Sequence, residues 1–158
     1  MQMYFQGPAK RIWETEGGRH RSISSYPAIE DAVKGSAMLI SGTSWQSSLE
    51  HEARRQAKCR GIFSVALIDH WVNYLERFER DGQRIWPDEF WVTDDFALEM
   101  AQNIFQGECV RQVPNYYLED QLERIKLSEK TGSNTLLYLT EPAEADWGRD
   151  LPGEFQAL

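Results

Sequence analysis

The sequence predicts an α/β fold: a three-layer, Rossmann-like arrangement around a parallel sheet of four to five strands, in a domain that we expect to be incomplete. Short apolar runs each end in a polar and aromatic cluster and are followed by segments with helical character; the runs are 37–41, 62–68, 89–93 and 109–113. Strands and helices that alternate in this way form βαβ units with parallel strands. Right-handed crossovers make consecutive strands neighbours, so we expect these four strands to lie side by side in sequence order.

The helix between the first two strands is predicted by signals at both of its ends. It should end near Arg60, because Gly61 can take the left-handed conformation that stops a helix. Its N-terminus has three candidate hydroxyl caps, which are Ser44, Ser47 and Ser48. A shorter helical segment over 27–33 precedes the first strand, since proline suits the first helical position.

The second half of the chain follows the same alternation. Residues 71–84 mix aromatic and charged side chains, which predicts a helix or a long loop that ends in an Asp-Gly turn. Apolar residues at helical spacing predict two further helices, over 95–105 and 118–130. A last strand is expected over 135–140.

These elements divide the chain into three predicted parts. Residues 1–7 read as the remnant of an expression tag, because Tyr4-Phe5-Gln6-Gly7 resembles the end of a protease-cleavable tag. The Rossmann-like domain would span residues 8–134. Residues 135–158 would begin a second, truncated α/β unit, since a helix that starts at Asp150 has room for only about one turn.

Bulk properties narrow the classes of function. The net charge of −8 argues against sequence-independent binding of nucleic acid, which depends on cationic side chains. The chain has no apolar run near the ~20 residues that cross a bilayer and no signal-peptide pattern, so we expect a cytoplasmic protein without a transmembrane segment. Cys59 and Cys109 lack metal-ligand spacing, and we expect two buried or half-buried free thiols.

Two clusters of basic side chains remain candidates for a local anion-binding patch. One is Arg19-His20-Arg21, and the other comprises Arg54, Arg55, Lys58 and Arg60. For the second cluster, a solvated helix face is the favoured interpretation.

The carboxyl ends of parallel strands are where open α/β sheets bind ligands, and the best candidates for chemistry fall there. Gly42-Thr43-Ser44 lies between a strand and a helix, where backbone N–H groups and the helix dipole can hold an anion. A turn glycine followed by hydroxyl caps explains the same three residues equally well.

The segment after strand 62–68 holds the densest polar and aromatic cluster. Asp69 and His70 supply a carboxylate and an imidazole, which are candidate general bases. Asn73 and Tyr74 are candidate ligand contacts, and the rings of Trp71 and Tyr74 can stack on a sugar or a base. The alternative is that Asp69 caps the next helix while both aromatic rings fill the core.

Two later clusters also have structural and functional interpretations. Asp94-Asp95 is more consistent with a helix cap than with Mg²⁺ binding, because carboxylates are favoured at helix N-termini. Asn115 is a candidate ligand contact, although a turn with an asparagine cap explains it as well. We expect no resident metal and no cofactor.

Four short motifs occur in order along the chain: Gly42-Thr43-Ser44, then Gly61-Ile62 with Ser64-Val65 before Asp69, then Pro87-Asp88-Glu89-Phe90-Trp91-Val92, then Val113-Pro114-Asn115. Over residues 37–142 they resemble the later part of the N-terminal domain of GT-B glycosyltransferases and related nucleotide-sugar epimerases. Phe63 stands where proline is common in that family. The resemblance implies a first domain that holds the acceptor and often the catalytic base, and a second domain that holds most of the nucleotide-sugar donor.

The resemblance also implies roles for particular residues. Asp69 or His70 would be the base, and Gly42, Thr43 and Ser44 would line the cleft. Strand 135–140 would then be the first strand of the second domain, with an exposed apolar edge that favours a homodimer.

We therefore expect a partial glycosyltransferase-like domain of polysaccharide or cell-envelope biosynthesis that binds a sugar or nucleotide-sugar and is inactive on its own. One alternative is a non-catalytic flavodoxin- or receiver-like interaction domain, in which Asp94 and Asp95 bind Mg²⁺ or accept a phosphoryl group. Another is a structural fragment that needs a partner.

Overall fold

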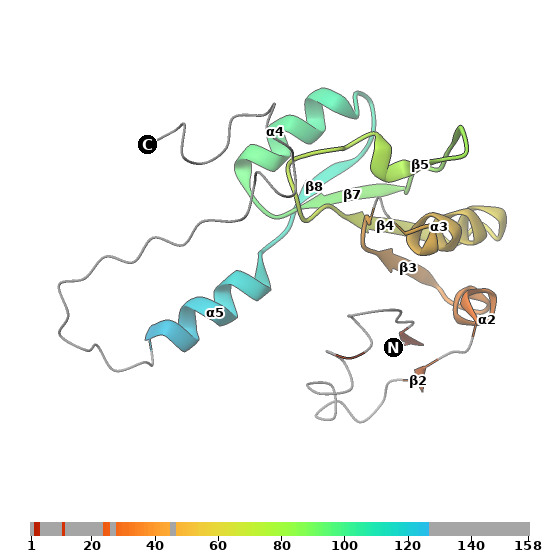
Figure 1. Cartoon of the computed structure of the whole chain (residues 1–158), viewed down its shortest axis with the longest axis horizontal. Helices are drawn as coiled ribbons and strands as arrows, with labels where there is room; N and C mark the ends of the chain where they lie inside the picture. The colour runs from red at the N-terminus through yellow and green to blue at the C-terminus, as the bar shows by residue number, and fades with distance from the viewer. Residues whose placement is uncertain (1, 4–10, 12–23, 26–27, 45–46, 127–158) are drawn as a thin grey trace, which may run out of the picture. The chain divides into compact units, whose positions relative to one another are not determined.

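A computed structural model describes residues 2–3, 11, 24–25, 28–44 and 47–126 of the chain. Its centre is a parallel sheet of four strands in the order β3-β4-β7-β8 (Figure 1). The strands are β3 (Met38–Ser41), β4 (Phe63–Leu67), β7 (Glu89–Val92) and β8 (Val110–Gln112). Every neighbouring pair is parallel, so the predicted α/β class and the order of the four strands are confirmed.

The chain divides into two compact units, Met1–Glu119 and Asp120–Leu158, and the sheet belongs to the first. The described helices are α2 (Ile29–Val33), α3 (Leu49–Cys59), α4 (Asp95–Ile104) and α5 (Tyr116–Lys126). Within the described residues, none of these helices is long and apolar enough to cross a membrane.

Several predictions lie outside the described residues. They are the strand 135–140, the helix start at Asp150, the domain boundary after residue 134, the cluster Arg19-His20-Arg21 and most of the segment 1–7. Two short N-terminal strands, β1 (Gln2–Met3) and β2 (Ser24–Ser25), pair with each other in parallel.

The ends of α3 follow from its sequence, with one difference from the prediction. At the C-terminus, the N–H of Ile62 donates to the carbonyl of Ala57 and the N–H of Gly61 donates to that of Lys58, and Gly61 has φ +63°. This is the Schellman arrangement that glycine favours after a helix. At the N-terminus, Ser48 occupies the cap position without a side-chain cap bond, and the hydroxyl of Ser47 accepts the N–H of Leu49 instead.

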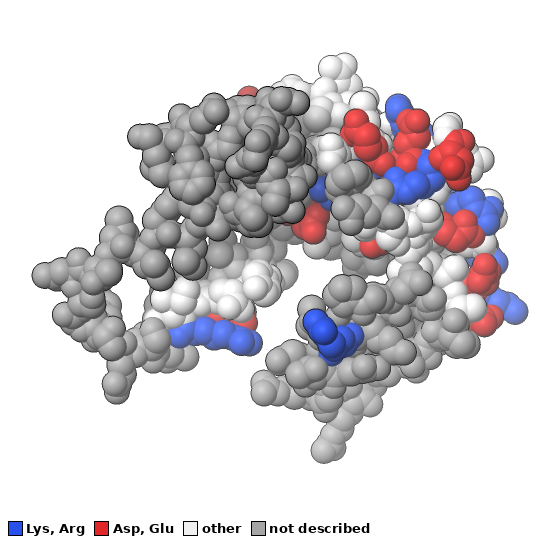
Figure 2. All heavy atoms as spheres, in the orientation of Figure 1, with Lys and Arg blue, Asp and Glu red and all other residues white. Residues whose placement is uncertain are grey.

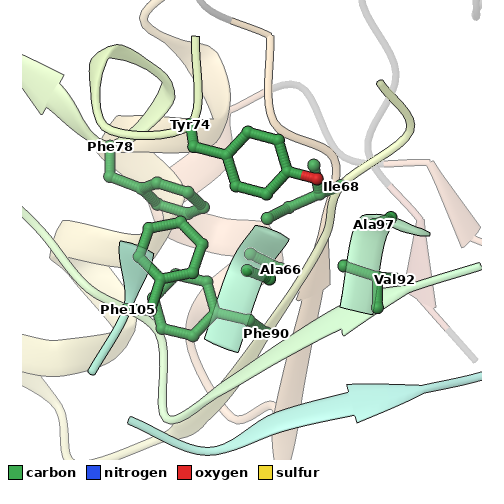
Figure 3. Packing of buried hydrophobic residues seen from close by; sticks show 9 residues of the cluster. Ala66, Ile68, Tyr74, Phe78, Phe90, Val92, Ala97 and Phe105 are labelled. Atoms are coloured by element: carbon green, nitrogen blue, oxygen red, sulfur yellow. The ribbon is translucent and has the colours of Figure 1, made fainter. Parts of the chain in front are cut away.

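The main core lies against one face of the sheet. Ala66 pairs with Phe90 and therefore points to the same face, as does Val92 two residues further on. The core cluster joins them to Ala97 and Ala101 of α4, to Phe105 directly after α4, and to Tyr74 and Phe78 of the segment between β4 and β7. Figure 3 shows the rings of Tyr74, Phe78, Phe90 and Phe105 gathered near Ala66.

Helix α3 contacts this same face. Ser41 pairs with Ala66, so the two side chains point to the same side of the sheet, and Arg54 of α3 donates a hydrogen bond to the Ser41 hydroxyl. The opposite face carries Met38, Ile40 and Phe63, all with large exposed fractions. Met38 pairs with Phe63, and Ile40 follows Met38 by two residues, so the three share that face. A helical layer on this second face, which a three-layer arrangement needs, stays a prediction.

The segment after β4 is a loop that contains a 3₁₀ turn, η2 (Glu76–Phe78), and a small antiparallel hairpin. The hairpin strands are β5 (Glu79–Arg80) and β6 (Gln83–Arg84). Asp81 and Gly82 connect them with φ +51° and +71°. Positive φ at both central residues is the mark of the tight hairpin turn that Asp-Gly favours. The sequence predicts a loop or a helix here, and the hairpin differs from that prediction.

Two expectations about the surface are wrong. Cys59 and Cys109 are free thiols but are exposed rather than buried. The second basic cluster is not one solvated face, because Arg54 is fully buried. Figure 2 shows acidic and basic side chains interspersed over the visible surface, without one large basic patch, and Arg55 pairs with Glu52 of the same helix.

Candidate functional site

The carboxyl end of β4 presents an exposed carboxylate that is held by a buried guanidinium. Nη1 of Arg77 lies 3.2 Å from Oδ1 of Asp69, and the side chains are 5% and 79% exposed respectively. Arg77 comes from η2, eight residues further along the chain. The ion pair therefore fixes one oxygen of Asp69 and leaves most of the carboxylate in contact with solvent.

Arg77 also ties Asp69 to the end of the neighbouring strand. Its Nη1 donates to the carbonyl of Thr43 at 2.9 Å and to Oγ1 of Thr43 at 3.2 Å, and its Nε donates to the carbonyl of Val72 at 2.9 Å. The Thr43 hydroxyl in turn donates to the carbonyl of Leu67 at 3.1 Å. The buried Thr43 side chain thus joins β3 to β4, so its hydroxyl is already engaged within the protein.

Arg54 is a second buried arginine behind the same strand ends. It donates to Oγ of Ser41 at 3.2 Å, to the carbonyl of Gly42 at 3.1 Å and to the carbonyl of Arg77 at 3.1 Å. Its guanidinium also lies over the ring of Phe78, 4.9 Å from the centroid. Burial lowers the pKa of Arg54 to about 10. This value is still well above neutral pH, so the side chain stays protonated there.

Arg80 completes a group that we call the arginine cluster: Arg54, Arg77 and Arg80. Arg80 donates to the carbonyl oxygens of Ser44 at 2.8 Å and Ser47 at 3.0 Å. The carbonyls of Gly42, Thr43 and Ser44 therefore each accept a bond from one member of the cluster. These cations hold the loop after β3 in place. This cluster was not predicted from the sequence, since its bonds to the loop after β3 join residues 12 to 36 positions apart.

His70 follows Asp69 in the sequence, and one of its two ring nitrogens is hydrogen-bonded to the backbone. Its Nδ1 accepts the backbone N–H of Trp71 at 3.0 Å. A neutral imidazole that accepts at Nδ1 carries its hydrogen on Nε2. The exposed His70 ring can therefore offer an N–H donor to a ligand, while Asp69 offers the acceptor oxygens.

Trp71 links this segment to the start of α4. Its indole Nε1–H donates to the carboxylate of Asp94, 3.1 Å from Oδ2. Asp94 is the N-cap of α4, and its Oδ1 accepts the N–H of Ala97 at 2.7 Å. The interpretation of Asp94 as a helix cap is thus confirmed. Asp95 accepts a bond from the side chain of Gln112 at 3.0 Å.

Tyr74 lies differently from the predicted ligand contact, whereas the role of the Asn73 side chain stays a prediction. Tyr74 is buried in the core with its ring 5.7 Å from that of Phe105, as the alternative interpretation had it. Its hydroxyl is buried and has no hydrogen-bond partner among the described residues. Burial, with a further contribution from Asp94, raises the pKa of this phenol. Asn73 has φ +57°, and its carbonyl accepts the N–H of Arg77 at 3.1 Å.

Asn115 belongs to the start of α5. Its Oδ1 accepts the N–H of Leu118 at 3.0 Å, and its carbonyl accepts that of Glu119. This is the asparagine cap that the sequence offered as the alternative. The hydrogen bonds described here connect Thr43 with Asp69 and do not reach Asn115. Across the described part of the chain, no three His, Cys, Asp or Glu side chains are grouped so that they could hold a metal ion.

A hollow of about 320 Å³ lies between α3 and the β5–β6 hairpin. His51 and Arg55 line it from the helix, and Asp81, Gly82 and Gln83 line it from the turn. Nε2 of His51 is 3.1 Å from the carbonyl of Gln83, which ties the hairpin to α3. Burial lowers the pKa of His51, an effect that the Gln83 carbonyl opposes and that Arg54 and Arg80 reinforce.

Comparison with known proteins gave no identification. No protein-family model matches the chain, and neither the curated proteins nor the solved structures gave a match.

Proposed function

We propose that this chain is a glycosyltransferase-like α/β domain of polysaccharide or cell-envelope biosynthesis that binds a sugar or nucleotide-sugar at the carboxyl ends of β3 and β4. The observation that carries the proposal is the Asp69–Arg77 pair, in which a 5% exposed arginine side chain fixes a 79% exposed carboxylate. A buried cation that holds an exposed acid at this end of a parallel sheet suits a ligand site, since open α/β sheets bind their ligands there.

The neighbouring groups support a ligand with many hydroxyl groups. The carboxylate of Asp69 is an acceptor for hydroxyl hydrogens, and Nε2 of His70 is a donor for hydroxyl oxygens. Both belong to consecutive residues whose orientation is set by bonds to Arg77 and to the Trp71 amide. A sugar ring with adjacent hydroxyl groups matches this alternation of acceptor and donor.

Within the proposed function, Asp69 is the better candidate for the general base. A carboxylate has lone pairs that can accept the proton of an attacking hydroxyl, whereas in neutral His70 the nitrogen that is not bonded to the Trp71 amide already carries a hydrogen. The bond from Arg77 keeps the carboxylate in one position. His70 would instead orient the hydroxyl or stabilise negative charge by hydrogen bonding.

Binding measured by ligand-observed NMR tests the proposal. The panel contains uridine diphosphate sugars and free hexoses, and the variants are Asp69→Asn and the control Glu99→Gln, which changes an exposed carboxylate in α4. We expect the wild-type chain to bind at least one ligand of the panel, Asp69→Asn to weaken that binding about tenfold or more, and Glu99→Gln to leave it unchanged. Wild-type binding to none of them, or equal binding by Asp69→Asn, would contradict the proposal.

A further inference from the structure

Two large aromatic side chains at the same end of the sheet are more than half exposed. Trp71 follows β4 and is 53% exposed, and Phe96 lies in the first turn of α4 and is 60% exposed. Their ring centroids are 6.1 Å apart at an interplanar angle of 87°. Apolar surface costs free energy when it faces water, so two adjacent exposed rings are a candidate surface for a ligand.

The position of Trp71 is fixed before any ligand arrives. Its indole N–H donates to Asp94, and Asp94 is itself held by the N–H of Ala97 at the start of α4. The ring of His70 meets that of Trp71 edge-on, with centroids 6.3 Å apart. A ring held from its polar edge and from one side loses little conformational freedom on binding, which favours affinity.

The charges around the two rings favour an uncharged ligand. Asp69 and Asp95 are exposed, and Asp94 accepts the Trp71 N–H. The arginine cluster behind them is directed at backbone carbonyls and, through Arg77, at one oxygen of Asp69, so its charge is already engaged by the protein. A phosphate or another anion would meet acidic oxygens at this surface, whereas a neutral ring would not.

We propose that Trp71 and Phe96 form the surface on which the uncharged ring of a sugar stacks, next to Asp69. The face of an aromatic ring is electron-rich and attracts the weakly positive C–H groups that line one face of a sugar ring. The inference rests on the proposed function and adds to it the part of the ligand that is recognised here, which is the neutral sugar ring rather than a nucleotide.

Saturation-transfer NMR with three probes tests this inference: methyl glucoside, N-acetylglucosamine and uridine diphosphate. The variants are Trp71→Ala, Trp71→Phe and Phe96→Leu. The matched control is Phe63→Leu, because Phe63 is also an exposed phenylalanine but stands at the opposite end of β4. Far-ultraviolet circular dichroism confirms that each variant is folded.

We expect a neutral sugar to bind the wild-type chain, with saturation strongest at the C–H protons of one ring face. Trp71→Ala should weaken this binding about tenfold, and Phe96→Leu should weaken it several-fold. Trp71→Phe keeps an aromatic ring but loses the bond to Asp94, so its affinity should lie between those of the wild type and Trp71→Ala. The Phe63→Leu control should bind as the wild type does.

Other outcomes separate this inference from the proposed function. If Asp69→Asn loses sugar binding while Trp71→Ala and Phe96→Leu keep it, the stacking surface is wrong and the proposed function stands. If uridine diphosphate binds in a way that depends on Trp71 and the neutral sugars do not bind, the rings take a nucleobase and the inference is overturned. If the wild type binds none of the probes and none of the nucleotide-sugars, both proposals fail.

Discussion

Replacing Arg54 by methionine is expected to destabilise the fold by ~2–4 kcal/mol. The change removes the donors to Ser41, Gly42 and the carbonyl of Arg77. Each buried acceptor left without a donor costs ~1–3 kcal/mol, and the Arg77 carbonyl belongs to a buried residue. Gly42 is exposed, so water can replace its donor. Methionine fills most of the space and carries no buried charge, which offsets part of the loss.

The neighbouring residue provides a matched control for this prediction. Arg55 has a side chain 41% exposed and pairs with Glu52, so Arg55→Met should change stability by less than ~1 kcal/mol. Urea unfolding followed by circular dichroism measures both variants, and for a chain of this length the expected loss in Arg54→Met corresponds to roughly 4–16 °C in Tm. If Arg54→Met unfolds within ~0.5 kcal/mol of the wild type, the arginine cluster does not stabilise the strand ends as described.

Three further predictions use four single-residue variants. Tyr74→Phe should leave the free energy of unfolding unchanged or raise it by up to ~1 kcal/mol, because the buried hydroxyl has no partner among the described residues; a clear loss in chemical unfolding would contradict this. Gly61→Ala should cost ~1 kcal/mol, because Gly61 has φ +63°. Gly42→Ala should leave the free energy of unfolding almost unchanged, because its new Cβ would meet Glu50 at an ordinary 3.6 Å. Equal losses of Tm in Gly61→Ala and Gly42→Ala would contradict this conformational explanation. Burial lowers the pKa of His51 from its usual 6.5, so its stabilising contribution is complete above that pH and is lost as the pH falls through the lower folded pKa. His51→Gln should therefore flatten the decline of unfolding free energy between about pH 7 and pH 5, and identical declines in both proteins would count against it.

The parallel sheet could be predicted because its signals are local. Each strand is a short apolar run, and the order β3-β4-β7-β8 follows from the handedness of short crossovers. The caps at Asp94 and Asn115 could be predicted equally well, since a capping side chain accepts a backbone N–H only two or three residues further along the chain. The Asp81-Gly82 dipeptide is a local signal for a hairpin as well as for the end of a segment, and only the second was predicted.

The candidate site was predictable in position but not in detail. Asp69 and His70 lie at the carboxyl end of β4 as expected, because strand ends fix where a loop begins. Which of two aromatic neighbours enters the core depends on the path of that loop: Tyr74 is buried, and Trp71 is exposed. The burial of Arg54 depends on carbonyls of residues 12 and 23 positions away. The spacing of charges along α3 therefore could not predict it.

The central claim is that a sugar binds at the carboxyl ends of β3 and β4, and a ¹H–¹⁵N NMR titration tests it most directly. After backbone assignment, the wild-type chain is titrated with the best-binding sugar or nucleotide-sugar. We predict that the largest shift changes fall on the amides of 69–74, of Thr43 and Ser44, and of the first turn of α4. Changes confined to the hollow between α3 and the hairpin, at His51 and Gln83, or no changes at saturating ligand, would contradict the claim.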